Sequence, residues 1–314
     1  MNSVPRPFLK WAGGKTQLLP QFDALYPSSQ SVRRYIEPFA GSAAVFFHVR
    51  SLFRPEQVFL ADSNEELINV YRAIRDDVET VIRRLAKHKV AHSRDHYYRV
   101  RAQRPHRLSN LSRAARMIYL NKTCFNGLYR VNGSGAFNVP LGRYKNPPIV
   151  DAENLRAVSD ALRVVTLKVA HFEETLDYAR EGDFIYFDPP YYPVSQTSYF
   201  TSYTSASFQA SDQERLADVY TALAGRGCLL MLSNSDSPFI RQLYRRFAVR
   251  TWTVRARRSI NSSADRRGSV SELVVLNYEP GCSSHAASAP KGRAVGARAG
   301  GTSLSANHRG TSRK

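Results

Sequence analysis

Short apolar segments that recur between helical patterns constrain the fold of this chain more than any other feature. They are rich in Ile, Val, Phe and Leu, and they cover residues 35–39, 57–62, 164–170, 183–190 and 228–235. Apolar runs of this length are typical of parallel strands that are buried on both faces. Their alternation with helices predicts an α/β chain with a doubly wound sheet.

Residues 211–227 carry the clearest helical pattern of the chain. Their apolar positions repeat with the i, i+3, i+4, i+7 spacing of a helix that packs on a core. Ser211 and Glu214 are expected to form a capping box at its start, and Gly225 and Gly227 to end it. Such a helix fits the crossover between the fourth and fifth strands.

Two hairpins are predicted besides the parallel strands. Residues 249–256 and 271–278 are apolar runs joined by an Arg-rich loop, which fits an antiparallel pair that closes the sheet. Asn132-Gly133 is a typical signal of a hairpin turn. This second hairpin lies within residues 83–156, a segment that interrupts the alternation of strands and helices.

The positive charge of the chain is concentrated in two segments. Lys and Arg number 45 against 26 Asp and Glu, a formal net charge of +19. Residues 83–156 carry 16 basic and 3 acidic side chains, residues 281–314 carry 6 basic and no acidic ones, and the remainder is balanced. A neutral body with a basic insert and a basic tail indicates a polyanionic partner. We expect the insert, helical to about residue 121, to be a small module and the tail to be disordered.

The cysteines and the N-terminus argue against several classes of protein. Cys124, Cys228 and Cys282 lie far apart without a C-x-x-C pair, so neither a disulfide framework nor a zinc site is predicted. The N-terminus lacks the apolar region of a secretion signal, and no apolar run approaches the length that spans a bilayer. We therefore expect a cytoplasmic protein with no membrane contact.

The stretch KWAGGKT at residues 10–16 ends like a phosphate-binding loop but is not one. Such a loop, G-x-x-x-x-G-K-[ST], needs a glycine five residues before Gly14, where this chain has Leu9. What remains is a permissive turn between an aromatic ring, Trp11, and a cation, Lys15, which suits a ligand with an aromatic ring and a carboxylate. A turn that only packs Trp11 into the core is an equal alternative.

A second glycine turn, at Gly41 in EPFAGSAAVFF, follows the first predicted strand and precedes a helix. Turns of this kind receive the nucleoside part of a cofactor at the carboxyl end of a sheet. Asp62 ends the next strand, 21 residues further on, where it can accept hydrogen bonds from ribose hydroxyls. Asp62 could instead cap the following helix, so only the turn and the acid together indicate a nucleoside cofactor.

FDPPYY at residues 187–192 is the most informative short run in the chain. Its prolines remove two backbone donors and leave carbonyl acceptors beside the Asp188 carboxylate and the Tyr191 ring. The exocyclic amine of adenine is a poor nucleophile because its lone pair is delocalised into the ring. If Asp188 and the Pro189 carbonyl accept its two hydrogens, the lone pair can attack an electrophile while Tyr191 stacks on a base flipped out of the duplex. A simple Pro-Pro turn is the alternative.

The order of FLKWAGGK, EPFAG, ADSN, a basic insert, DPPY, LSNSD and RRSINSS resembles the Dam-type adenine-specific DNA methyltransferases of the D12 class. The resemblance covers nearly all of residues 6–280. It implies a Rossmann-like methyltransferase sheet with an inserted, mainly helical DNA-recognition module that includes a β-hairpin. The implied division is a catalytic domain, residues 1–82 and 157–280, a recognition module, residues 83–156, and the basic tail, residues 281–314.

The same resemblance implies S-adenosylmethionine as cofactor, methyl transfer to adenine N6, double-stranded DNA as substrate, and no metal. The residues that it places at the reacting base are Asp188, Pro189, Pro190 and Tyr191. Those that it places at the cofactor are Trp11, Ala12, Gly13, Lys15, Glu37, Phe39, Gly41, Asp62, Phe172 and Asp188. At Ala43 the sequence departs from the family, which usually has a second glycine there. The added methyl group slightly restricts the backbone conformations that the turn can adopt.

Residues 120–147 look like the recognition hairpin of the Dam branch, which implies the target GATC. Arg130 can present its guanidinium to guanine O6 and N7, and Lys10 and Tyr144 would sit at the first guanine. Phe125, where the family usually has Tyr, would insert into the stack that the adenine leaves. The residues placed at the DNA are Lys10, Phe125, Asn126, Leu128, Arg130, Pro140, Tyr144, Arg258 and Ser259.

Three alternatives stay open. The first is the same chemistry at another site that contains GAT, as the partner of a restriction nuclease. The second is a catalytically silent DNA-binding protein, against which the intact Asp-Pro-Pro-Tyr argues. The third is an RNA or protein methyltransferase, although glutamine methylation uses Asn where this chain has Asp188. We expect a monomer that acts on bacterial or phage DNA.

Overall fold

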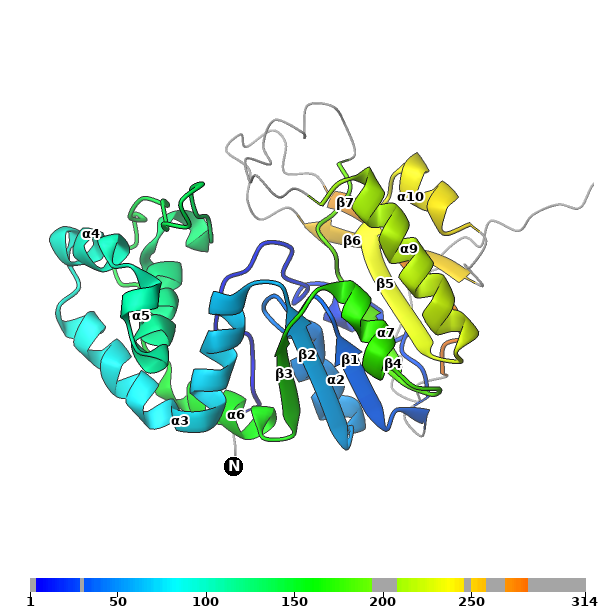
Figure 1. Cartoon of the computed structure of the whole chain (residues 1–314), viewed down its shortest axis with the longest axis horizontal. Coiled ribbons are helices and arrows are strands. Elements are labelled where there is room, and N and C mark those ends of the chain that lie inside the picture. The colour runs from blue at the N-terminus through cyan, green and yellow to red at the C-terminus, as the bar shows by residue number, and fades with distance from the viewer. Residues whose placement is uncertain (1–3, 29–30, 194–207, 246–249, 258–268, 282–314) are drawn as a thin grey trace, which may run out of the picture.

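A seven-stranded sheet runs through the molecule in the order β3-β2-β1-β4-β5-β7-β6 (Figure 1). The computed structural model describes residues 4–28, 31–193, 208–245, 250–257 and 269–281. Neighbouring strands among β1 to β5 pair in parallel, whereas β7 is antiparallel to both β5 and β6. The strands are β1 Arg34–Glu37, β2 Gln57–Asp62, β3 Val165–Val169, β4 Phe184–Phe187, β5 Leu229–Ser235, β6 Arg250–Arg257 and β7 Ser269–Leu276.

The five predicted parallel strands and the predicted closing hairpin are confirmed as β1 to β5 and as β6 with β7. The chain first lays β2 and β3 on one side of β1 and then returns to lay β4 and β5 on the other. The order of the strands therefore reverses between β1 and β4. In doubly wound sheets the ligand binds at this point, beyond the carboxyl ends of the strands.

Helices cover both faces of the sheet because successive side chains of each strand point to opposite faces. In β1, Tyr35 packs in one apolar cluster with α2, and Ile36 packs in another with α9 and α10. The α-helices are α1 Leu19–Phe22, α2 Ala44–Phe53, α3 Glu65–Val90, α4 Arg94–Ala102, α5 Asn110–Thr123, α6 Ala152–Leu162, α7 Thr175–Tyr178, α9 Ala210–Gly225 and α10 Pro238–Leu243. The 3-10 helices are η2 Pro105–Arg107, η3 Phe125–Gly127 and η4 Phe172–Glu174.

The predicted helix at residues 211–227 is α9, but its predicted capping box is wrong. The helix begins one residue earlier, and the Asp212 carboxylate accepts a hydrogen bond from the Gln209 N–H at 2.7 Å. Ser211 and Glu214 therefore lie inside the helix, where they cannot cap it. The predicted end is correct, since Gly227 follows with a φ of 82°.

The basic insert forms the lobe of α3, α4 and α5 on the left of Figure 1. Its apolar residues continue the cluster on one face of the sheet, so the lobe shares a core with the sheet. Residues 83 and 157 fall inside α3 and α6, and the division into domains at these points stays a prediction. At the predicted turn, the Gly135 N–H donates to the Asn132 carbonyl at 2.9 Å, and Val131 bridges Phe137 across the hairpin.

Some sequence predictions lie outside the described residues. They concern Arg258, Ser259, the part of the segment RRSINSS that follows Arg257, and residues 282–314 of the basic tail. Within the described part of the chain, no helix has both the length and the apolar character that a membrane crossing requires.

Candidate active site

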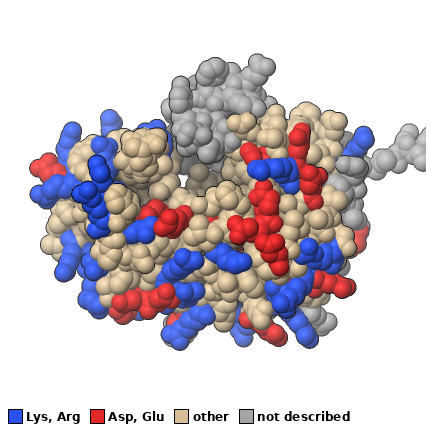
Figure 2. Space-filling view, viewed as in Figure 1, with Lys and Arg blue, Asp and Glu red and all other residues tan. Residues whose placement is uncertain are grey.

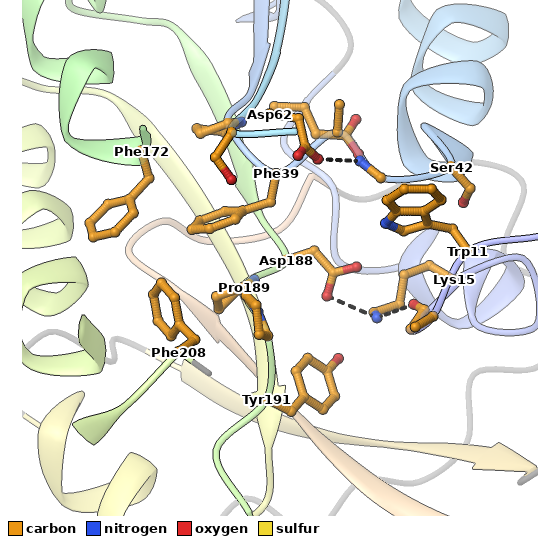
Figure 3. A pocket seen from close by; sticks show the side chains of 18 of the residues that line it. Trp11, Lys15, Phe39, Ser42, Asp62, Phe172, Asp188, Pro189, Tyr191 and Phe208 are labelled. Atoms are coloured by element: carbon orange, nitrogen blue, oxygen red, sulfur yellow. Dashed lines mark hydrogen bonds and ion pairs between the residues drawn. The ribbon is translucent and has the colours of Figure 1, made fainter. Parts of the chain in front are cut away.

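A cavity of about 760 Å³ opens beyond the carboxyl ends of β1 and β4. Its volume is within the range of small-molecule sites. Figure 3 shows side chains from the N-terminal segment, from β2 and from the loops after β1 and β4 around it. All the residues predicted for the cofactor and the reacting base line this cavity: Trp11, Ala12, Gly13, Lys15, Glu37, Phe39, Gly41, Asp62, Phe172, Asp188, Pro189, Pro190 and Tyr191.

Asp62 holds the shape of the turn that follows β1. Its carboxylate accepts hydrogen bonds from the backbone N–H groups of Gly41 at 3.1 Å and Asn64 at 2.9 Å. Gly41 has a φ of 46°, and a Cβ there would lie 3.0 Å from the Trp11 ring, so the turn requires glycine. Asn64 caps α3 by accepting from the Leu67 N–H, so the alternative role of Asp62 as the helix cap is wrong.

Ala43, the departure from the family's glycine, adopts a left-handed backbone with a φ of 54°. This conformation costs a residue with a Cβ about 1–2 kcal/mol. Ala43 is fully buried and precedes α2, next to the cavity. The extra methyl group therefore introduces backbone strain at the turn.

Two carboxyl groups give the cavity an acidic side. Glu37, at the end of β1, is buried and accepts a hydrogen bond from the Tyr35 hydroxyl at 2.8 Å. Burial raises the pKa of Glu37 well above its ordinary value. Burial also raises the pKa of Asp62, although the two backbone donors oppose the shift.

Asp188 and Lys15 form an ion pair inside the cavity (Figure 3). Lys15 Nζ lies 2.8 Å from Asp188 Oδ1 and 4.7 Å from the centre of the Tyr191 ring, and it also donates to the Gly13 carbonyl. Lys15 is only 3 % exposed, so its charge needs these partners. Burial raises the pKa of Asp188 to about 6, and the positive charge of Lys15 opposes that rise.

Two buried amides support the Asp-Pro-Pro-Tyr loop. Gln213 of α9 donates to the Pro190 carbonyl at 3.0 Å, and Asn234 of β5 donates to Gln213 at 2.9 Å. Asn234 also accepts from the Tyr192 N–H at 3.3 Å. Among the described residues no hydrogen bond reaches the Pro189 carbonyl, so this acceptor is available to a ligand. Sequence reasoning missed Gln213, because nothing in a helical pattern marks one buried glutamine as functional.

Three phenylalanines form an aromatic wall of the cavity. Phe39 and Phe172 stack with ring centres 5.5 Å apart, and Phe208 lies 5.9 Å and 5.7 Å from them. Flat aromatic faces of this kind suit a purine ring. Phe208, Asp212 and Arg215 line the cavity but were not predicted, because they come from α9 and the residues before it, far from the glycine motifs.

Trp11 connects the cavity with the basic insert. Its ring stacks on Tyr129 with ring centres 5.4 Å apart and an angle of 27° between the planes. The Trp11 ring is half-buried, packs against the core and also lines the cavity. The packing of Trp11 on the core agrees with the second alternative for the KWAGGKT turn, and the ligand of the first alternative stays a prediction.

Lys10 and the hairpin of the basic insert lie against each other, although they are far apart in the sequence. Lys10 Nζ donates to the Tyr144 hydroxyl at 3.1 Å and lies 4.3 Å from the centre of that ring. Asn121, at the end of α5, accepts from the Lys10 N–H at 2.8 Å and donates to the Lys10 carbonyl at 2.7 Å and the Gly127 carbonyl at 2.9 Å. The N-terminal segment is thus attached to the insert.

The other predicted DNA residues of the insert are exposed. Phe125 is 49 % and Leu128 is 37 % exposed, and Arg130 and Pro140 are exposed as well. Asn126 is exposed and has a φ of 55°, which turns the chain between the two apolar residues. Figure 2 shows Lys and Arg side chains over much of the surface of this lobe. An exposed apolar loop on a basic lobe suits contact with both bases and phosphates.

The buried cysteines are free thiols. Cys124 and Cys228 each donate to backbone carbonyls and form no disulfide. Within the described ranges, no group of three or more His, Cys, Asp or Glu side chains is placed to hold a metal ion.

The fold is that of a Rossmann-like methyltransferase. Residues 11–260 match the model of the D12 class N6 adenine-specific DNA methyltransferases, and the chain belongs to this family. Its members modify adenine in DNA and generally take the methyl group from S-adenosylmethionine.

The relatives that align with most of the chain include type II methyltransferases and DNA adenine methylases. Type II methyltransferase M1.LlaDCHI of Lactococcus lactis subsp. cremoris is 42 % identical over 279 residues, 87 % of this chain and 95 % of that protein. Type II methyltransferase M.MjaIII of Methanocaldococcus jannaschii is 42 % identical over 288 residues, 87 % of this chain and 99 % of that protein. The DNA adenine methylase of Serratia marcescens is 35 % identical over 275 residues, 86 % of this chain and 98 % of that protein.

Proposed function

We propose that this enzyme transfers a methyl group from S-adenosylmethionine to N6 of an adenine flipped out of duplex DNA, within the sequence GATC. The observation that supports the chemistry is the cluster of Asp188, Pro189 and Tyr191 at the cavity (Figure 3). A carboxylate, a carbonyl with no partner among the described residues and an aromatic face meet the needs of an adenine base and its N6 amine.

The chemistry of the lining residues fits the cofactor. Asp62 beside the Gly41 turn would accept hydrogen bonds from ribose hydroxyls, and Phe39 and Phe172 would contact the adenine ring. Glu37 would add a carboxyl group near the positively charged part of S-adenosylmethionine. When bound, the cofactor supplies a methyl group on a positively charged sulfur, which is a strong electrophile.

The residues of the chain prepare the adenine for attack. The Asp188 carboxylate would accept one N6 hydrogen and the Pro189 carbonyl the other, which directs the nitrogen lone pair out of the ring plane. The Tyr191 ring would stack on the base and hold it against these acceptors. The Lys15 ammonium group, 2.8 Å from Asp188, favours the ionised carboxylate, which is the stronger hydrogen-bond acceptor.

The exposed loop of the insert would read the target. Arg130 would contact the guanine of the terminal pair, Lys10 with Tyr144 the first guanine, and Leu128 with Pro140 the thymine methyls. Phe125, with Asn126 beside it, would fill the stack that the adenine leaves. Arg258 and Ser259 would contact the backbone near the flipped base. These roles are proposals that rest on the resemblance and on the exposure of the loop.

Expression in a host that lacks adenine methylation tests the proposal. Plasmid from such cells should resist a nuclease that methylated GATC blocks, and it should be cut by one that requires methylated GATC. The Asp188→Ala variant should leave the plasmid unmethylated. Asp218→Ala, on the exposed face of α9, is the matched control and should behave like the parent. Modified adenine elsewhere, with GATC unmodified, would disprove the site but keep the reaction.

A catalytically silent DNA-binding protein is the second candidate, favoured only by the concentration of charge in the insert. Titration calorimetry with S-adenosylmethionine separates the two, because a silent protein should show no binding. The relatives named type II methyltransferase and those named DNA adenine methylase both fit the proposed reaction.

We infer a monomer in which residues 83–156 form the recognition module and residues 281–314 add phosphate contacts.

A further inference from the structure

Glu272 meets the Asp-Pro-Pro-Tyr loop from a strand far away in the sequence. Its carboxylate accepts a hydrogen bond from the Tyr191 hydroxyl at 2.6 Å. Glu272 lies in β7, where it pairs with Ser235 of β5. Only the antiparallel insertion of β7 between β5 and β6 brings it to the carboxyl end of β4.

We propose that Glu272 is a positioning residue, which holds the Tyr191 ring in the orientation that stacks on the flipped adenine and thereby sets the rate of methyl transfer. The inference rests on the proposed function, because it assigns a part in that reaction to a residue that touches neither base nor cofactor. Glu272 belongs to none of the sequence motifs and is not among the residues that line the cavity.

The geometry supports two anchors for the Tyr191 side chain. One is the Lys15 ammonium, 4.7 Å from the centre of the ring, and the other is the Glu272 carboxylate at the hydroxyl. A hydrogen bond from a hydroxyl to a carboxylate at this length is charge-assisted and stronger than a neutral one. Tyr191 is half-buried and lies in a loop, so without the second anchor its ring would lose orientation before the base arrives.

Glu272 also acts on Asp188 through its charge. Its negative charge raises the pKa of Asp188, whereas Lys15 lowers it and burial contributes the largest rise. Other titratable groups that interact with Asp188 electrostatically are Glu37 of β1, Tyr186 of β4 and Tyr191 itself. A variant that removes the charge of Glu272 but keeps an acceptor should therefore lower the pKa of Asp188.

The experiment compares Glu272→Ala, Glu272→Gln, Tyr191→Phe and the double variant Tyr191→Phe with Glu272→Ala in the full chain. The readouts are single-turnover methyl transfer to plasmid DNA from a host without adenine methylation, and calorimetric affinity for S-adenosylmethionine. Glu56→Gln, an exposed carboxylate before β2, is the control for loss of a charge. Thermal unfolding of each variant checks that it is folded.

We expect Glu272→Ala and Tyr191→Phe each to slow transfer about tenfold, with cofactor affinity changed by less than about twofold. The double variant should be no slower than either single one, since both remove the same contact. Glu272→Gln should keep most of the rate and move the acid limb of the pH–rate profile to lower pH. A merely structural residue would not move that limb.

Two results would overturn the proposal: unchanged rates in Glu272→Ala, or effects of Tyr191→Phe and Glu272→Ala that multiply. If the acid limb of the pH–rate profile does not move in Glu272→Gln, the charge of Glu272 does not influence the ionisation of Asp188. If the parent enzyme itself transfers no methyl group to this DNA while it binds S-adenosylmethionine, the proposed function fails instead, so the two failures are distinct.

Discussion

The role proposed for Asp188 depends on an ionised carboxylate in a place where burial favours the neutral acid. The pKa of about 6 follows from burial and from the opposing charge of Lys15. Above this pH both carboxylate oxygens can accept a hydrogen bond from the N6 amine, whereas below it the protonated group carries an O–H donor and is a weaker acceptor. Activity should therefore be complete at neutral pH and be lost as the pH falls through the pKa.

We predict that the single-turnover rate falls about tenfold per pH unit once the pH is below 6. The rate is measured from pH 5 to pH 8 with DNA binding recorded in parallel. Binding that stays constant assigns the loss to the chemical step. A rate that is flat down to pH 5 would show that the ionisation of Asp188 is not required.

Replacement of Lys15 by Met should move the acid limb of the pH–rate profile to higher pH. Without the ammonium group the pKa of Asp188 rises, because Lys15 lowers it. We expect a loss of at least about tenfold at pH 7 that is partly recovered at pH 8.5. The recovery is the internal control, since a variant that had only lost cofactor affinity would not regain its rate at higher pH.

At the scale of elements, the buried pair Gln213 and Asn234 joins α9 and β5 beneath the Asp-Pro-Pro-Tyr loop. Replacement of Gln213 by Ala leaves the Pro190 carbonyl and the Asn234 amide without this partner. We expect the free energy of unfolding to fall by about 2 kcal/mol and the rate of transfer to fall with it. Urea unfolding measures the first, with the exposed neighbour Glu214→Ala as a control that should stay within about 0.5 kcal/mol.

Three histidines join α3 and α4 to Tyr119 of α5. His88 Nδ1 lies 3.0 Å from His96 Nε2, and the His88 ring stacks on Tyr119 with ring centres 4.7 Å apart. His92 Nδ1 lies 2.9 Å from the Tyr119 hydroxyl. Burial lowers the pKa of His88 to about 4, with further contributions from His96 and Arg84. The cluster is therefore neutral in the folded lobe at physiological pH.

This cluster should make the lobe sensitive to acid. The unfolded chain takes up the proton of His88 near pH 6.5 and the folded chain only near pH 4, so stability is complete above pH 6.5 and is lost as the pH falls between these values. Melting temperatures at pH 7.5 and 5.0 measure the effect. His88→Phe, which can still stack on Tyr119, should show a smaller fall than the parent, and His106→Phe, at an exposed position, should show the same fall as the parent.

The elements themselves were largely predictable from the sequence. β1 to β5 follow from apolar runs and α9 from its spacing, because these patterns are local. The start of α9 was missed, since a carboxylate two residues earlier than expected captures the Gln209 N–H. Nothing local showed that α3 would continue through residue 83, or that it would be kinked at Asp77, where the φ of −154° is not helical.

At the scale of the whole molecule, Asn121 attaches the N-terminal segment to the basic insert. It is 2 % exposed and lies outside the cavity, yet it holds Lys10, which precedes Trp11 of the cavity wall. We predict that Asn121→Ala weakens binding of S-adenosylmethionine about tenfold through the loss of these hydrogen bonds. Titration calorimetry measures the affinity for S-adenosylmethionine, with Asn132→Ala at the hairpin turn as the control. Equal affinities in both variants would show that the attachment does not support the cavity.

The sequence by itself determined the strands, the glycine turns and the Asp-Pro-Pro-Tyr motif, because spacing and residue type are read from neighbours along the chain. It also showed, through the order of these motifs, the family to which the chain belongs. Only the tertiary structure decided that Lys15 pairs with Asp188, that Gln213 holds Pro190 and that Glu272 reaches the loop. These contacts join segments far apart in the sequence, and their partners are chosen by strand order and side-chain packing, which no local pattern contains.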